Sequence, residues 1–151
     1  MKKSIYFLIV PFILGYSFIK PNNEKEHFSR IYETAVWGRN KDGLGSSGAG
    51  STLEVCSEYI SFIQNFLKEK NIQSVVDAGC GDWEFSQFID WGDIDYSGFD
   101  VVTSVIERNI KTFTQENIHF FEANIVDTNL PSADLLISKD VLQHLDANRI
   151  R

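Results

Sequence analysis

Residues 75–83, with the sequence VVDAGCGDW, constrain the fold of this chain more than any other segment. Two β-branched residues and an acid run into Gly79, Cys80 and Gly81, as when a buried strand ends in a tight turn. Glycine adopts positive φ at little cost and lets a ligand approach the backbone closely. We therefore predict a buried strand that ends in a ligand-binding turn.

The spacing between this turn and a later acid indicates a binding role for that acid. Asp100 lies 23 residues after Asp77 and comes directly after the strand-like residues 96–99, YSGF. In nucleoside-binding βαβ units, an acid at the end of the second strand hydrogen-bonds the ribose hydroxyls. The spacing predicts a unit of this kind.

The rest of residues 51–145 alternates between helical and strand patterns. Ser51-x-x-Glu54 is a capping box that predicts the start of a helix, and alternating helices and strands predict a Rossmann-like, doubly wound parallel α/β sheet in three αβα layers. We expect about four strands, an incomplete sheet, and a ligand beyond the carboxyl ends of the strands. The expected helices cover 52–70, 84–89, 104–115 and a start at 141–145, and the expected strands cover 72–78, 94–101, 118–123 and 134–138. The side chains expected to face the core are Val55, Cys56, Tyr59, Ile60, Ile63, Phe66 and Leu67 in the first helix and Val105, Ile106, Ile110 and Phe113 in the third.

The N-terminus has a different character. Lys2 and Lys3 precede an apolar run over 5–19, typical of the hydrophobic core of a signal peptide. The run is shorter than the roughly 20 residues that span a bilayer. We expect residues 1–20 to be a leader or membrane anchor, and a segment packed on the domain is the alternative.

Residues 21–51 form a polar, Gly/Ser-rich segment before the domain proper, which we place at 52–151. Scattered aromatic residues precede the run GLGSSGAGS at 43–51. Such a run is typical of a flexible linker. It also fits a mobile flap that closes over a ligand with Arg39, and both interpretations stay open.

Composition narrows the possible partners. The 14 Lys and Arg residues against 21 Asp and Glu residues leave a net charge of −7 without a basic stripe, so tight nonspecific binding of nucleic acid is not expected, whereas recognition of a structured RNA by its shape stays open. The two cysteines, Cys56 and Cys80, have no metal-ligand spacing and make no disulfide framework, so no metal site is predicted. We interpret Cys80 as a small residue packed under the turn rather than as a catalytic thiol.

The glycine pattern also limits which kind of nucleoside the turn can bind. A dinucleotide site needs G-x-G-x-x-G, whereas Glu84 stands at the third glycine position here. A carboxylate at a helix start would repel a pyrophosphate, and no Walker-type Gly-Lys-Ser/Thr follows. The pattern favours a nucleoside without phosphates, which argues against the alternative of a nicotinamide-dependent oxidoreductase.

Four segments in register carry a family resemblance: VVDAGCGDW at 75–83, YSGFDVV at 96–102, FFEANIVDTNLP at 120–131 and DLLISKDVLQHL at 134–145. With them the chain resembles the class I S-adenosylmethionine-dependent methyltransferases over residues 72–145. Residues 31–52 are similar to the segment before the domain in a small group of these enzymes.

This resemblance implies that the chain uses S-adenosylmethionine, and it implies roles for individual residues. Asp77 would organise the glycine turn and the amino end of the cofactor, Asp100 would bind both ribose hydroxyls, and Asn124 stands where the family usually has an acid at the adenine edge. Lys139 and Asp140 would lie beside the point of methyl transfer. The cofactor-binding residues implied in this way are Asp77, Gly79, Cys80, Gly81, Asp82, Trp83, Asp100, Val101, Asn124, Ile125, Lys139 and Asp140.

Other expectations concern the chain as a whole. The family has seven strands, so we expect this chain to be partial, with its fourth strand at an exposed edge that favours self-association. The domain is expected in the cytoplasm, where the cofactor is found. A noncatalytic nucleoside-binding or interaction module is the alternative function. No general base or methyl acceptor is identified, and we interpret His144 as a packed histidine.

Overall fold

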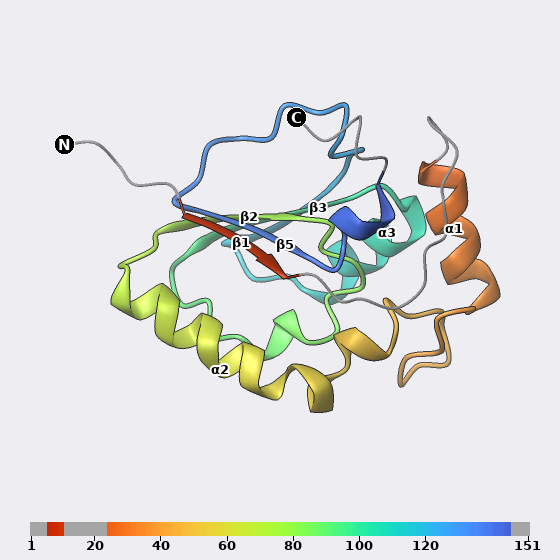
Figure 1. Ribbon diagram of the computed structural model, residues 1–151, viewed down its shortest axis with the longest axis horizontal. Coiled ribbons are helices and arrows are strands. Elements are labelled where there is room, and N and C mark those ends of the chain that lie inside the picture. Colours follow the sequence, from red (N-terminus) through yellow and green to blue (C-terminus); the bar gives the residue numbers. More distant parts are fainter. Residues whose placement is uncertain (1–5, 11–23, 146–151) are drawn as a thin grey trace.

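The computed structural model of the protein describes residues 6–10 and 24–145. Its centre is a five-stranded sheet with the strand order β1-β5-β2-β3-β4, and all neighbouring strands are parallel (Figure 1). The strands are β1 (Tyr6–Val10), β2 (Ser74–Ala78), β3 (Asp95–Asp100), β4 (Ile118–Glu122) and β5 (Leu135–Lys139). The predicted Rossmann-like parallel α/β fold is confirmed.

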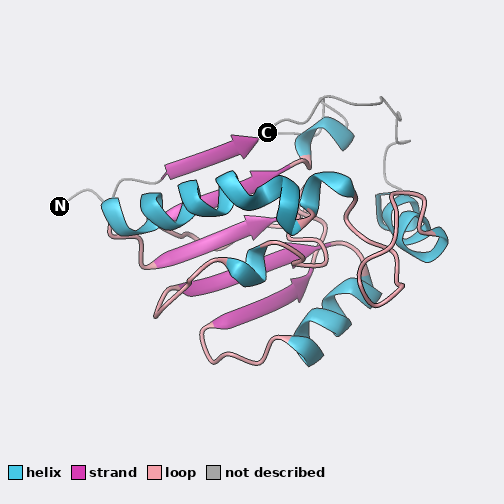
Figure 2. Ribbon diagram, turned by 90° about the horizontal axis from the view of Figure 1, so that it is seen from below, coloured by secondary structure: helices cyan, strands magenta, loops and turns pink. Residues whose placement is uncertain are grey.

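Three α-helices and three short 3-10 helices accompany the sheet. They are α1 (Glu24–Thr34), η1 (Ala49–Ser51), α2 (Leu53–Glu69), η2 (Ser86–Phe88), α3 (Thr103–Thr112) and η3 (Leu142–His144). Figure 2 shows α2, η2 and α3 over one face of the sheet, and buried side chains from these parts form one core cluster with the strands. Helix α1 lies beyond the carboxyl ends of the strands.

The core explains why the central strands are so apolar. β2 lies between β5 and β3, and its last four residues, which point alternately to the two faces of the sheet, are all buried. A strand that is covered on both faces has no solvent side and therefore reads as a continuous apolar run. The strand ends at Asp77 and Ala78, so the predicted acid lies inside the sheet, next to the turn.

The N-terminal strand corrects one expectation. The sequence predicts a leader or anchor over residues 1–20, with a segment packed on the domain as the alternative, and it predicts an exposed edge at the fourth expected strand, which is β5. Instead, Tyr6–Val10 pairs with β5 along its whole length, so β5 is an interior strand and the edges are β1 and β4. The remaining residues expected in a leader lie outside the described part of the chain. Within the described ranges, no helix has the length and apolarity to cross a membrane.

Helix α2 begins one residue later than the predicted capping box implies. Its N-cap is Thr52, whose side chain accepts a hydrogen bond from the Val55 amide, whereas Ser51 belongs to η1. The predicted apolar stripe is correct for the buried core of the helix but wrong for Val55, which is 59% exposed. Ile110 in α3 is likewise 53% exposed, and Asn109 is buried in its place.

Two predicted helices are shorter than expected, and one helix was not predicted. The segments at 84–89 and 141–145 contain only the three-residue 3-10 helices η2 and η3. Helix α1 was missed because its sequence is polar, with Ile31 as its only buried apolar residue. Its position depends on contacts with the end of the sheet rather than on an apolar stripe of its own.

Candidate functional site

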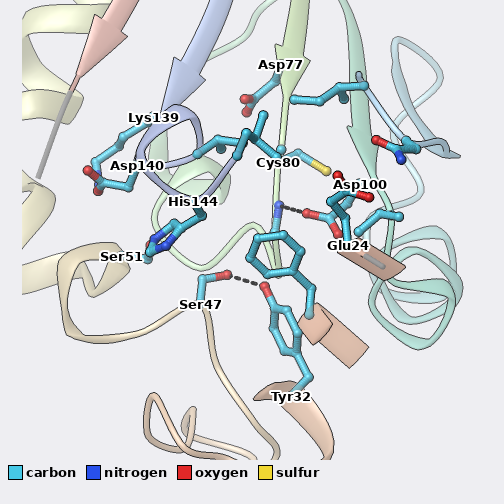
Figure 3. A pocket seen from close by; sticks show the side chains of 18 of the residues that line it. Glu24, Tyr32, Ser47, Ser51, Asp77, Cys80, Asp100, Lys139, Asp140 and His144 are labelled. Carbon is cyan, nitrogen blue, oxygen red and sulfur yellow. Dashed lines mark hydrogen bonds and ion pairs between the residues drawn. The ribbon is translucent and has the colours of Figure 1, made fainter. Parts of the chain in front are cut away.

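A pocket lies where the carboxyl ends of the strands meet α1 (Figure 3). The turn after β2 and the ends of β3, β4 and β5 form its floor, and α1, the loop after it and η3 form its walls. The lining residues are Glu24, Phe28, Tyr32, Trp37, Ser47, Ser51, Asp77, Gly79, Cys80, Gly81, Phe85, Asp100, Val101, Ala123, Asn124, Ile125, Lys139, Asp140, Val141, His144 and Leu145.

Most of the predicted site residues meet in this pocket. Those that line it are Asp77, Gly79, Cys80, Gly81, Asp100, Val101, Asn124, Ile125, Lys139 and Asp140. Asp82 and Trp83 do not line it. Trp83 is 1% exposed and packs against the rings of Trp91 and Phe113 in the core, because the chain turns inward directly after the glycines.

The glycine turn has the predicted backbone conformation, but protein side chains pack against it where a ligand alone was predicted. Gly79 and Gly81 have φ of +89° and +55°, which glycine adopts readily. A Cβ on Gly79 would lie 2.3 Å from a methyl group of Val141, and one on Gly81 would lie 2.3 Å from Ser47 Oγ. Protein side chains, and not only a ligand, therefore require glycine at both positions.

Asp100 ends β3 beside this turn. Its two carboxylate oxygens accept hydrogen bonds from the Gly81 amide at 3.1 Å and the Val102 amide at 3.0 Å. Burial raises the pKa of Asp100, while these amides oppose the rise. Each oxygen keeps a lone pair after its amide contact, so the carboxylate can accept further hydrogen bonds from the pocket.

Asp77 lies deeper, on β2. The Tyr96 hydroxyl donates to its Oδ2 at 2.7 Å. Burial raises the pKa of Asp77 to about 6, and the Tyr96 hydrogen bond opposes this rise. The carboxyl group therefore changes its charge near neutral pH, and a cation bound beside it would favour the ionised form.

Asn124 is already engaged within its own turn. Its Oδ1 accepts from the Val126 amide at 3.1 Å, and its Nδ2 donates to Asp127 at 2.9 Å. The oxygen retains one acceptor position. The amide can thus still receive a donor from a ligand in the pocket.

Lys139 and Asp140 end β5 as an ion pair, and both line the pocket. The Lys139 ammonium also donates to the Gly50 carbonyl at 2.9 Å and lies 5.3 Å from the centre of the Phe85 ring. Asp140 has φ of +58°, a left-handed conformation that Asp adopts more often than most non-glycine residues. This backbone conformation directs the chain from β5 into η3.

The segment before the domain is docked on the glycine turn. Ser47 Oγ donates to Asp82 at 2.7 Å, and the Tyr32 hydroxyl lies 2.7 Å from the same Oγ. Ser47 and Tyr32 both line the pocket, so this segment packs on the domain, and its closure over a ligand stays a prediction. Arg39 does not line the pocket, because it hydrogen-bonds Gly43 within its own loop.

Three aromatic rings form one wall of the pocket. His144 lies 5.2 Å from Trp37 and 6.1 Å from Phe28, measured between ring centroids. Burial lowers the pKa of His144; Asp140 opposes this effect and His27 adds to it. The sequence patterns did not predict these rings as site residues, although the unusual density of aromatic residues in the polar segment 21–42 was a usable signal.

Cys80 also lines the pocket, but as a buried thiol. Burial raises its pKa well above the ordinary value, and the neighbouring Asp100 adds to the rise. A thiol of this kind stays protonated at neutral pH and is a poor nucleophile. Among the described residues, no group of three His, Cys, Asp or Glu side chains can hold a metal ion.

No protein-family model and no curated protein sequence matches the chain. Among solved structures, the methyltransferase domain of a bacterial protein, CtHen1-CN, matches with a TM-score of 0.53 and 25% identity over 62% of this chain and 54% of that chain. Magnesium protoporphyrin IX methyltransferase from Synechocystis PCC 6803, solved with bound SAH, matches with a TM-score of 0.50 and 16% identity over 80% of this chain and 56% of that chain.

These matches confirm the predicted resemblance to class I methyltransferases and the Rossmann-like fold. The chain spans about half the length of each of these two structures.

Proposed function

We propose that the pocket binds S-adenosylmethionine and that the protein transfers its methyl group to an acceptor. Support comes from the fold, from the class I methyltransferases that share it, and from the chemistry of the pocket floor. Bound there, the cofactor supplies a methyl group activated by a positively charged sulfur. The protein aligns the acceptor and excludes water.

The carboxylate of Asp100 is the observation that carries this proposal. It lies at the end of β3 and lines the pocket, and one backbone amide on each oxygen fixes its orientation. Two oriented acceptor oxygens match the two neighbouring hydroxyls of a ribose. Charge-assisted hydrogen bonds of this kind are about twice as strong as neutral ones.

The other end of the pocket suits the charged end of the cofactor. Asp77 lies one strand away on β2 and keeps an oxygen free of the Tyr96 contact. A carboxylate with its pKa raised to about 6 attracts an ammonium or sulfonium group and releases its proton when that cation binds. No α-helix begins at the glycine turn, where a dinucleotide fold would hold a pyrophosphate. The described residues therefore fit a cationic nucleoside better than a phosphorylated one.

The test is a calorimetric titration of S-adenosylhomocysteine into the full chain. We expect saturable binding by the wild type and a loss of about 10- to 100-fold in affinity for Asp100→Asn, because hydrogen bonds to a charged group are worth about 1.5–3 kcal/mol. Asp95→Asn is the matched control: it removes an exposed carboxylate at the opposite end of the same strand.

Circular dichroism of each variant verifies folding before the titration. Equal binding by wild type and Asp100→Asn would refute the assigned role of this carboxylate. A folded wild type that does not bind would refute the proposed function. Saturable binding of NAD would favour the oxidoreductase alternative instead.

A further inference from the structure

The end of β5 carries a carboxylate oxygen that the protein leaves without a partner. Asp140 Oδ2 is paired with the Lys139 ammonium, whereas Oδ1 is buried and has no hydrogen-bond partner among the described residues. A buried carboxylate oxygen without a donor is costly. The left-handed backbone of Asp140 nevertheless keeps this residue in the pocket wall. The donor missing at this oxygen is one that a ligand in the pocket would supply.

The charges around this oxygen limit what that ligand is. Glu24, Asp77, Asp100 and Asp140 are the acids that line the pocket, and Lys139 is the only Lys or Arg among the lining residues that the structure describes. The Lys139 ammonium is already held by Asp140 and the Gly50 carbonyl. A carboxylate or phosphate group would find no free cation here, whereas a positive group would meet the carboxylate of Asp140.

The aromatic wall favours the same kind of ligand. Trp37, Phe28 and His144 line the pocket together with Asp140, and the charge of Asp140 acts on His144. Aromatic faces pack against apolar and aromatic groups. Carboxylate and rings together are complementary to an amine carried on an apolar or aromatic group.

We propose that the methyl acceptor is such an amine, bound as a cation with an N–H donated to Asp140 Oδ1 and its apolar part against Phe28 and Trp37. This inference rests on the proposed function and adds the substrate class to it. It also gives His144, interpreted above as a packed residue, a chemical role.

An ammonium must lose a proton before it can act as a nucleophile. His144 lines the same pocket, and its imidazole, whose pKa is lowered by burial, is the group that would accept that proton. The nitrogen lone pair then forms a bond to the methyl carbon, and the carbon–sulfur bond breaks with its electron pair on sulfur. The products are a methylated ammonium, a neutral thioether and a protonated His144, so atoms and charges balance.

Three probes that share a phenethyl group and differ in the charge of their polar end test the substrate class. Phenethylamine, 2-phenylethanol and 3-phenylpropionate are titrated by ligand-observed NMR into the full chain, with and without saturating S-adenosylhomocysteine. We expect the amine to bind at least about 10-fold more tightly than the alcohol, because one hydrogen bond becomes charge-assisted. The carboxylate should not bind saturably.

Asp140→Asn should remove the preference for the amine, whereas Asp93→Asn, at an exposed position, should keep it. Trp37→Ala should weaken the amine and the alcohol alike and keep their ratio, which tests the wall even if Asp140→Asn fails to fold. An alcohol or carboxylate that binds as tightly as the amine, or a preference that survives in folded Asp140→Asn, would overturn the inference. Because the series is also run without S-adenosylhomocysteine, a failure of cofactor binding would count against the proposed function alone.

Discussion

The contact between Ser47 and the glycine turn gives a sharp test of how the pocket is built. Gly81 and Gly92 have nearly the same positive φ, +55° and +51°. A Cβ on Gly92 meets nothing within 4 Å, whereas a Cβ on Gly81 lies 2.3 Å from Ser47 Oγ. Alanine therefore pays the same backbone cost at both positions, but only at Gly81 must it also displace a neighbouring side chain.

The magnitudes follow from the contacts that are lost. The left-handed conformation costs alanine about 1–2 kcal/mol at either position. At Gly81, Ser47 must also move away from the carboxylate of Asp82 and the hydroxyl of Tyr32. A hydrogen bond to a carboxylate is worth about 1.5–3 kcal/mol, and one between two hydroxyl groups is worth about 1 kcal/mol. We expect the free energy of unfolding to fall by about 1–2 kcal/mol in Gly92→Ala and by about 3–6 kcal/mol in Gly81→Ala.

The assay is urea unfolding followed by circular dichroism, with linear extrapolation of the free energy to water. Ser47→Gly provides the second arm, because it removes the atom that clashes. In that background Gly81→Ala should cost about as much as Gly92→Ala, a coupling measured by a double-mutant cycle. Equal costs of Gly81→Ala and Gly92→Ala in the wild-type background would show that the segment does not dock on the turn.

Two further predictions concern stability. Burial raises the pKa of Asp77 in the folded state to about 6, so the folded protein still holds a proton that the unfolded chain releases near pH 4. The stabilisation from this group is therefore complete below pH 4 and is lost as the pH rises through 6. The free energy of unfolding should therefore fall between pH 4 and pH 7 by about 3 kcal/mol more in the wild type than in Asp77→Asn, and parallel pH profiles would contradict the assignment. In α2, Ile63→Ala should lower the free energy of unfolding by about 2–5 kcal/mol because Ile63 is 0% exposed, whereas Val55→Ser, at a position that is 59% exposed, should change it by no more than about 0.5 kcal/mol. Urea denaturation compares the two variants. A large loss of stability in Val55→Ser would mean that Val55 belongs to the buried stripe, as the sequence predicts.

The floor of the pocket was readable from the sequence because its signals are local. A strand that is buried on both faces needs an apolar run, and the turn that ends it needs residues tolerant of positive φ. The same reasoning placed Asp100 at the end of the next strand. The parallel order of strands then brings these ends to one edge of the sheet, whatever the rest of the chain does.

Other local signals were ambiguous between neighbouring residues. Ser51 and Thr52 are both good N-cap residues, and only the packing of η1 against α2 decides that Thr52 caps the helix. Each of the two predicted apolar stripes likewise includes one residue that is exposed. Val55 and Ile110 are apolar, but nothing covers them among the described residues, because α2 and α3 contact the sheet over only part of their surfaces.

The amino-acid sequence by itself determined the parallel α/β architecture, the glycine turn and the carboxylates at the strand ends. Only the tertiary structure decided that Tyr6–Val10 joins the sheet, that α1 and Ser47 close over the turn, and that His144 and Asp140 line the same pocket. The reason is the range of the interactions. Strand, turn and cap preferences act over a few residues, whereas strand pairing and the docking of a polar segment depend on partners 35 to more than 100 positions away, as in the contacts of Ser47 with Asp82 and of Tyr6 with Leu135.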